Sequence, residues 1–211
     1  MTGWMIASGL LAASALLGSC TTMTKDQCLA GAWGEKGYAD GAAGYPATRL
    51  DDHIQACAKF QVTPNPAAYA SAREDGLRSY CTFERGWAEG RAGNAYYGVC
   101  RPEEEEAFVP AYQDGLRLHG VEDALQTAQG ALSSAEARIE SREDKLAAKE
   151  RELRGEGLTD EERERIRDRI QEVRDEIRDA RRAARDARDA LDSAEWDVRR
   201  VRRELGGRYP V

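Results

Sequence analysis

Apolar and small residues recur alternately three and four positions apart through the second half of the chain. This alternation is the seam spacing of a coiled coil. The first seam contains Leu125, Ala128, Leu132, Ala135, Ile139, Arg142, Leu146, Lys149 and Leu153. The second contains Ile166, Ile170, Val173, Ile177, Ala180, Ala184, Ala187, Leu191, Ala194, Val198, Val201 and Leu205. The pattern predicts two long helices, and Arg142 and Lys149 are charged exceptions that either snorkel or specify a partner helix.

A short break separates the two seams. Residues 155–157 read Gly-Glu-Gly, a sequence that ends a helix. Thr159 and Glu162 then form the signature of a capping box, which starts the next helix. We therefore expect a turn here rather than one continuous helix.

Folding back about this break brings the two seams together. Facing residues then have a nearly constant sum of residue numbers, so that Leu125 meets Leu191 and Ala135 meets Ala180. Layers of large residues would alternate with layers of alanine. We predict an antiparallel helical hairpin within one chain, with its base docked on the preceding helix. The alternative is one long helix that pairs between two chains.

The first half of the chain contains an internal repeat. Residues 35–44 (EKGYADGAAG) align with residues 84–93 (ERGWAEGRAG), and DGLR occurs at both 75–78 and 114–117. Glycines at this spacing line one face of a helix with bare backbone, so that a second helix can approach closely. The repeat predicts related helical units.

Five aromatic residues accompany these glycines and form a candidate binding surface: Trp33, Tyr38, Trp87, Tyr96 and Tyr97. On the functional interpretation they line a shallow groove that binds a glycan or a peptide strand. On the structural interpretation they fill the core between short helices, which is the commoner use of such rings.

Composition divides the chain in two. Of its 211 residues 33% are charged and only 7% aromatic, with a net charge of -7. Trp, Tyr, Gly and Cys crowd into the part before residue 121, and Ala, Arg, Asp and Glu dominate the rest. The expected parts are a signal peptide at 1–19, a tether at 20–25, a helical repeat module at 26–120, the hairpin at 121–206 with its turn at 155–159, and a tail at 207–211. The predicted fold is all-α.

Four cysteines lie in the module: Cys28, Cys57, Cys81 and Cys100. A module this small needs covalent support, so we expect two disulfides. Zinc is the competing use, but no close C-x2-C pair occurs, and we expect no metal site. Three pairings are possible; we prefer Cys28 with Cys57 and Cys81 with Cys100, because each bond then closes one repeat.

Cys20 is the expected site of lipid attachment. It follows an apolar run, Ile6 to Leu17, too short to span a bilayer comfortably, and Leu17-Gly18-Ser19-Cys20 resembles a bacterial lipoprotein signal-peptidase box. The first five residues carry no Lys or Arg, unlike a usual secretory n-region. Simple secretion and an uncleaved anchor are the alternatives. Thr21 and Thr22 after the cysteine carry no acidic retention signal of the enterobacterial kind, which by resemblance favours the outer membrane, facing the periplasm.

Together these motifs resemble a family of Gram-negative lipoproteins known as domain of unknown function 2799, over about residues 26–120. The resemblance implies signature positions at Trp33, Gly37, Asp40, Gly41, Gly44, Cys57, Tyr69, Gly76, Cys81, Gly86, Gly90, Gly93, Tyr96 and Cys100. The family implies no activity, and the charged hairpin lies outside its pattern.

Catalysis finds little support in the sequence. His53 and His119 are the two histidines, and neither lies in a metal or nucleophile motif. We expect no enzyme activity, no cofactor and no nucleic-acid partner, since both charge signs are nearly balanced along the hairpin. The expected function is a cell-envelope lipoprotein, held in the membrane by its lipid, that binds a protein or acts as a spacer through the hairpin. The alternative is a module that binds peptidoglycan or another glycan.

Overall fold

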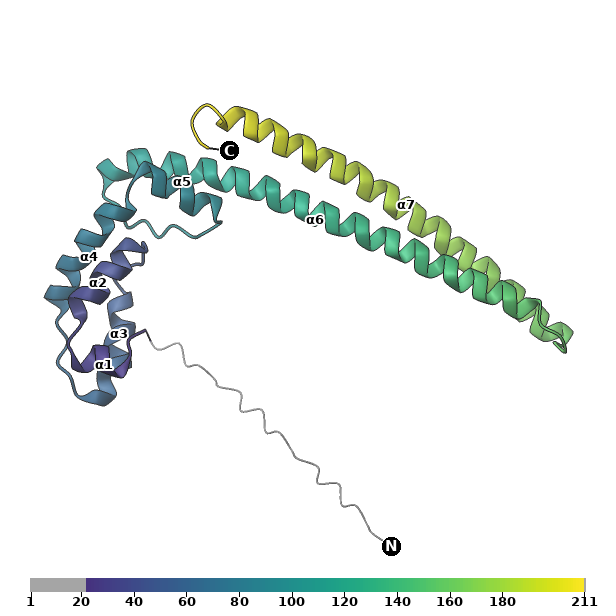
Figure 1. Ribbon diagram of the computed structural model, residues 1–211, viewed down its shortest axis with the longest axis horizontal. Helices are drawn as coiled ribbons and strands as arrows, with labels where there is room; N and C mark the ends of the chain where they lie inside the picture. Colours follow the sequence, from purple (N-terminus) through teal and green to yellow (C-terminus); the bar gives the residue numbers. More distant parts are fainter. Residues whose placement is uncertain (1–21, 211) are drawn as a thin grey trace, which may run out of the picture. The chain divides into compact units, whose positions relative to one another are not determined.

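The computed structural model describes residues 22–210, and all regular secondary structure in this part of the chain is helical (Figure 1). The elements are α1 (Lys25–Leu29), α2 (Trp33–Ala42), α3 (Arg49–Cys57), the 3-10 helix η1 (Ala58–Phe60), α4 (Pro66–Tyr80), α5 (Phe83–Arg91), α6 (Pro102–Leu153) and α7 (Asp160–Leu205). The chain divides into two compact units, one up to Gly76 and one from Leu77. The all-α prediction is confirmed.

The internal repeat in the sequence corresponds to two helix pairs that pack through equivalent backbone contacts. We call α2 with residues 66–76 of α4 the first repeat, and α5 with residues 102–117 of α6 the second repeat. A Cβ atom added to Gly37 would lie 2.1 Å from the backbone oxygen of Tyr69, and one added to Gly86 would lie 2.4 Å from that of Phe108. Glycine therefore brings helix backbones into contact at equivalent places in both repeats.

The contact from the opposite helix is repeated as well. A Cβ atom at Gly76 would meet the backbone oxygen of Tyr38 at 2.2 Å, and one at Gly115 would meet that of Trp87 at 2.6 Å. Each glycine therefore holds its helix against the middle of the partner helix. The predicted relation between the two helical units is confirmed.

In each repeat a side chain also donates a hydrogen bond to an equivalent backbone carbonyl just after the first helix. In the first repeat Arg73 donates from Nη2 to the Tyr45 carbonyl at 2.7 Å. In the second repeat the Tyr112 hydroxyl donates to the Asn94 carbonyl at 2.7 Å. Different side chains thus satisfy the same backbone group, which explains why the aligned residues Arg73 and Tyr112 need not match in type.

One disulfide closes each repeat, in the preferred pairing. Cys28 is bonded to Cys57, and Cys81 is bonded to Cys100. Each bond belongs to a small core. The first core contains Met23, Cys28, Trp33, Cys57 and Tyr69, and the second contains Leu77, Tyr80, Cys81, Cys100 and Phe108.

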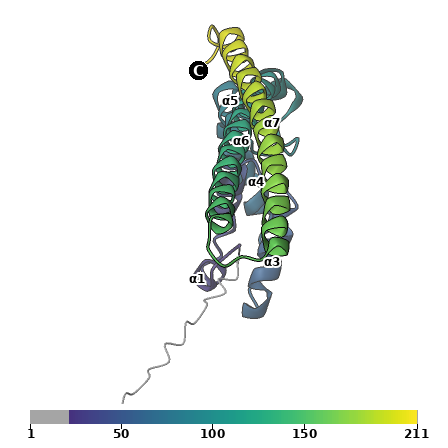
Figure 2. The ribbon, with the colours of Figure 1, turned by 90° about the vertical axis from the view of Figure 1, so that its right-hand side faces the viewer.

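α6 and α7 form the predicted antiparallel hairpin, seen from two sides in Figures 1 and 2. Gly157 has a φ of 79° in the turn, where a side chain would be strained. Thr159 and Glu162 form the predicted capping box, with the Glu162 backbone N–H donating to Thr159 Oγ1 at 3.2 Å. The expected limit between residues 120 and 121 falls inside α6, which is continuous from Pro102 to Leu153.

The register of the hairpin differs from the predicted one by one seam position. Glu143 pairs with Arg181 at 2.7 Å. On the opposite flank Arg142 pairs with Glu176 at 2.7 Å. The two flanks together set Arg142 level with Ile177, which directly follows Glu176, so one turn earlier on α6 Ile139 is level with Ala180 and not with Ile177. A seam has two alternating kinds of position, one followed by a step of three residues and one by a step of four. In an antiparallel hairpin each kind packs against the other kind on the facing helix. The prediction had paired positions of the same kind.

The shifted register changes the composition of the layers. The level pairs are now Leu125 with Ala194, Ala128 with Leu191, Leu132 with Ala187, Ala135 with Ala184, and Ile139 with Ala180. Four of these five layers therefore set one large residue against one alanine. This complementarity keeps the spacing of the helix axes even, which alternating large and small layers would not do.

Cross-linking distinguishes the two registers. Cysteines at Ala135 and Ala184 are expected to form a disulfide within one chain under mild oxidation, because facing seam positions lie within disulfide reach. Cysteines at Ala135 and Ala180 should join much more slowly, since about 6 Å of helix rise separates Ala180 from the level of Ala184. Mass spectrometry under non-reducing conditions measures both rates. Faster joining through Ala180 would contradict the observed register, and purely intermolecular joining would contradict the hairpin itself.

Candidate functional site

The five aromatic residues proposed as a binding surface do not share one environment. Trp33 is 2% exposed and Trp87 is 9% exposed, so both rings belong to cores. Tyr96 is half-buried, and its hydroxyl donates to Glu105 at 2.6 Å. Tyr38 and Tyr97 are the exposed members. Most of this set therefore supports the structural interpretation, in which the rings fill the core.

The expected lipid-attachment site, Cys20, lies outside the residues that the structure describes.

A buried polar cluster in the first repeat was missed by the sequence analysis. Asp40 Oδ2 accepts hydrogen bonds from His53 Nε2 and from the Tyr69 hydroxyl, each at 2.7 Å, and Oδ1 lies 3.2 Å from Arg49 Nε. A carboxylate can only accept, so His53 carries its proton on Nε2. One feature of the sequence could have indicated this cluster. Tyr69 occupies the position that Phe108 holds in the second repeat, and a buried tyrosine hydroxyl requires a hydrogen-bond partner.

This cluster has the residue types of an acid–base pair, but its position is structural. His53 is 1% exposed and Asp40 is 5% exposed, so the cluster lies inside the first unit. Within residues 22–210 no group of His, Cys, Asp and Glu side chains has the arrangement of a metal site. The cluster therefore holds α2, α3 and α4 of the first unit together.

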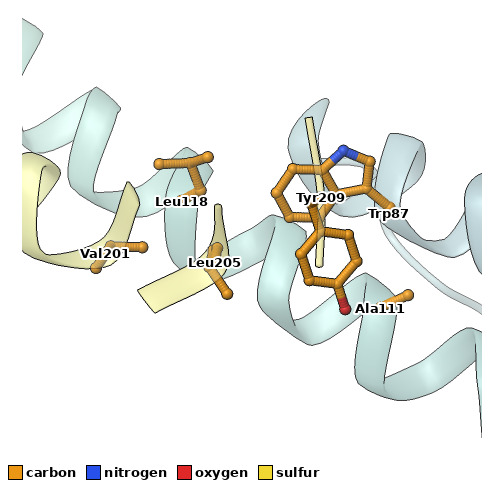
Figure 3. Close-up of a cluster of buried hydrophobic side chains, with 6 residues drawn as sticks. All are labelled: Trp87, Ala111, Leu118, Val201, Leu205 and Tyr209. Atoms are coloured by element: carbon orange, nitrogen blue, oxygen red, sulfur yellow. The ribbon is translucent and has the colours of Figure 1, made fainter. Parts of the chain in front are cut away.

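The C-terminal segment packs back onto the second repeat. Tyr209 stacks on Trp87 with 4.1 Å between ring centroids, and the two rings lie next to each other in Figure 3. The Tyr209 hydroxyl donates to Asp114 at 3.0 Å, and Arg208 pairs with the same carboxylate at 2.9 Å. Val201 and Leu205 complete this cluster with Ala111 and Leu118. The base of the hairpin thus docks as predicted, but the expected tail at 207–211 is an integral part of the fold up to Pro210.

The two flanks of the hairpin differ in chemistry near its base. One flank is closed by pairs that join glutamates of α6 to arginines of α7. These pairs are Glu122 with Arg202 at 2.8 Å, Glu136 with Arg188 at 3.2 Å, Glu143 with Arg181 at 2.7 Å, and Glu150 with Arg174 at 3.1 Å. Exposed ion pairs contribute little stability each, but their regular spacing specifies register and covers this flank with charge.

The other flank, near the base of the hairpin, carries a groove of small residues with a volume of about 540 Å³. We call it the alanine groove. Its lining from α6 is Gly120, Val121, Ala124, Thr127, Ala128 and Ala131, and from α7 it is Ala190, Ser193, Ala194 and Asp197. Asp197 is the one charged residue among them, whereas the grooves toward the tip are lined mainly by Arg, Lys and Glu.

An exposed tryptophan on α7 directly precedes Asp197, a lining residue of the alanine groove. Trp196 is 53% exposed and lies one turn after Ser193 on α7. Arg200 lies over its ring at 5.1 Å. Tryptophan is enriched among the residues that supply most of the binding energy at protein interfaces. The sequence analysis did not single out Trp196, because its position lies outside the seam.

A known protein family matches the part of the chain that contains the two repeats. Residues 32–117 match the family described as "Protein of unknown function (DUF2799)". This stretch is a DUF2799 domain. The expected resemblance over about residues 26–120 is thereby confirmed in its core, while the link of the family to lipoproteins stays a prediction. Searches of the curated proteins and of the solved structures each found no match.

The DUF2799 domain begins just before α2 and ends at Arg117, inside α6. It therefore contains both repeats and stops before the alanine groove and α7. Within the described residues, none of the helices combines the length and the apolar character needed to cross a bilayer. The hairpin is thus an addition to the DUF2799 domain that is continuous with its last helix.

The buried tyrosines predict loss of stability in alkali. Burial raises the pKa of Tyr96 to about 12, and burial followed by the hydrogen bond to Asp114 raises the pKa of Tyr209. Burial also raises the pKa of Tyr69 and of Tyr80. Tyrosine in the unfolded chain ionises near pH 10, so above this pH the folded state retains more protons, and the free energy of unfolding falls as the pH rises.

Absorbance at 295 nm, measured against pH together with helical circular dichroism, checks this expectation. Four of the eight tyrosines, Tyr69, Tyr80, Tyr96 and Tyr209, should ionise only as the helices melt. A single simple transition of all eight near pH 10 with the helices intact would contradict it.

Proposed function

We propose that this protein is a non-enzymatic, lipid-anchored protein of the cell envelope whose α6–α7 hairpin binds a helical segment of another envelope protein. The observation that carries the proposal is the alanine groove with Trp196 beside it. In this proposal the DUF2799 domain is the membrane-proximal base, and the hairpin is the binding arm.

The groove has the surface that a third helix needs. Helices pack with their axes 8–10 Å apart, and small residues permit the closer end of this range. Ala131 and Ala190 lie at the lip of the groove, where other hairpin positions of the same kind carry charge. A partner helix with an apolar face would bury this patch beside a single charged lining residue, Asp197, which pairs with Arg200 at 2.8 Å, and Trp196 would anchor that edge.

The hairpin also has the dimensions of a spacer. α7 contains 46 residues, which corresponds to a length of about 70 Å at 1.5 Å per residue. A rigid arm of this length, fixed to a membrane at its base, would carry the partner well away from the lipid surface. Binding near the base and spacing along the arm are compatible roles.

The proposed cellular location is based on the Cys20 motif and on the two disulfides. The two bonds of the described residues suit an oxidising compartment such as the periplasm. We propose attachment through Cys20 to the outer membrane, facing the periplasm. Labelled palmitate is expected to enter the wild-type protein and not the Cys20→Ser variant; equal labelling of both would refute lipidation at this residue.

The glycan alternative has less support than the hairpin proposal. Stacking on a sugar needs exposed ring faces, and Trp33 and Trp87 are covered by the cores of their repeats, which leaves Tyr38 and Tyr97 as the exposed rings of the set.

Photo-cross-linking in intact cells tests the hairpin proposal. A benzophenone side chain at Ser193, in the groove, is expected to yield one discrete adduct with another protein, identified by mass spectrometry. Adding Ala131→Arg should reduce this adduct at least tenfold, because the charge and bulk occupy the groove. Gln129→Arg is the matched control, since Gln129 is also exposed on α6 but is not part of the groove lining, and it should leave the adduct unchanged. Equal loss in both variants, or no adduct, would refute the proposal.

A further inference from the structure

The two repeats present the same face, and within residues 22–210 this face is covered in the second repeat but exposed at Tyr38 in the first. In the second repeat Trp87 is 9% exposed, Asp114 is 9% exposed and Ala111 is fully buried. Their cover is the end of α7 with Tyr209 (Figure 3). In the first repeat Tyr38, which holds the place of Trp87, is 51% exposed.

The equivalence of these faces is fixed by backbone contacts. A Cβ atom at Gly76 would approach the Tyr38 oxygen and the Ala42 nitrogen, at 2.2 and 2.7 Å. A Cβ atom at Gly115 would approach the corresponding Trp87 oxygen and Arg91 nitrogen, at 2.6 and 2.7 Å. The helices therefore cross alike, so Ala72 and Asp75 stand beside Tyr38 as Ala111 and Asp114 stand beside Trp87.

The cover in the second repeat shows the chemistry that this kind of face accepts. An aromatic ring stacks on the ring at the position of Trp87, while a hydroxyl and a guanidinium reach the carboxylate of Asp114. We propose that the face formed by Tyr38, Ala72 and Asp75 binds the end of a partner protein's helix that carries an aromatic residue next to a basic one, in the manner of Arg208 and Tyr209.

One difference between the faces makes the open one wider. Phe83 flanks Tyr209 in the second repeat, with 5.3 Å between ring centroids. Gly34 holds the place of Phe83 in the first repeat, and a Cβ atom there would have its nearest neighbours only at 3.9 Å. The incoming ring therefore stacks on one side only, and the space at Gly34 admits a ring larger than that of tyrosine.

A partner protein is a better occupant than a second copy of this chain. In each copy the segment from Leu205 to Tyr209 already covers its own second repeat. A second copy would have to surrender those contacts to bind the first repeat of its neighbour, whereas a separate protein would not. This inference concerns the DUF2799 domain and does not depend on the alanine groove.

The probe is a synthetic peptide of residues 194–210 with a benzophenone side chain in place of Tyr209, added to the full-length protein in detergent. Cross-linking is expected within α2 or α4 of the first repeat, mapped by mass spectrometry. Tyr38→Ala should reduce the yield at least fivefold. Tyr97→Ala is the matched control, because Tyr97 is 56% exposed against 51% for Tyr38, and it should leave the yield unchanged. Asp75→Asn should weaken the yield in the same direction as Tyr38→Ala.

Three results would overturn the inference. Cross-links confined to α5 would mean that the peptide only displaces the chain's own segment from Trp87. A yield that does not depend on Tyr38 would mean non-specific contact. Self-association of the unmodified protein that is lost in Tyr38→Ala would assign the face to a second copy. None of these results bears on the groove variant Ala131→Arg, so the two proposals fail independently.

Discussion

Replacing Gly90 with alanine is expected to destabilise the unit from Leu77 onward by about 2–4 kcal/mol. The added Cβ atom would lie 2.1 Å from the Tyr112 backbone oxygen and 2.9 Å from the Leu116 backbone nitrogen. Backbone atoms cannot rotate away as a side chain does, so α5 and α6 must separate and lose the contacts beneath Trp87. The loss corresponds to a fall in melting temperature of about 5–15 °C, measured by circular dichroism.

Gly130→Ala provides the matched control for this prediction. Gly130 also lies within a helix, but a Cβ atom there would have nothing within 4 Å. The substitution should therefore stabilise the protein by about 0.5–1 kcal/mol through helix propensity alone. If Gly90→Ala and Gly130→Ala shifted the melting temperature alike, the close approach of α5 and α6 would be refuted.

The sequence predicted those features that depend on local spacing. Glycines recurring within two aligned segments gave the helix pairs, and the seam of residues such as Leu132 and Ile177 gave the two long helices. The break at Gly157 and the cap at Thr159 lie within a few residues of each other, so they could be recognised directly. The cysteine pairing followed from the repeat boundaries.

The register of the hairpin required information of a different kind. A constant sum of residue numbers is satisfied by several registers that differ by one seam position, because both helices have the same period. Only the pairs on the flank, such as Glu136 with Arg188, decide among them. The alanine groove depends on that register, since Ala131 and Ala190 come to lie together only once it is fixed.

The remaining features depend on contacts between distant segments. Tyr209 reaches Asp114 across 95 positions, and nothing near either residue marks the other as its partner. Asp40 joins His53 and Tyr69 from three different helices, and only the extra hydroxyl of Tyr69 relative to Phe108 hints at it. The continuity of α6 across residue 120 was hidden because composition changes there while helical conformation does not.

Removing the bond between Cys28 and Cys57, by alanine at both positions, is expected to destabilise the unit up to Gly76 by about 3–4 kcal/mol, because the closed loop spans 29 positions. The effect is large relative to the unit, since both half-cystines belong to its core of five buried residues. Hydrogen exchange should show α1, α2 and α3 losing protection while the α6–α7 hairpin remains protected, because the hairpin belongs to the other unit.

The bond between Cys81 and Cys100 supplies the comparison. It closes a shorter loop of 19 positions, and the unit that contains it also has the α6–α7 seam and the cluster around Leu118 and Leu205. Alanine at Cys81 and Cys100 should therefore loosen the helices around the second repeat while α1, α2 and α3 keep their protection. If the Cys28 and Cys57 variant kept full protection in α2, then buried contacts such as the Asp40 cluster would suffice to hold the first repeat, and an oxidising compartment would not be needed for its folding.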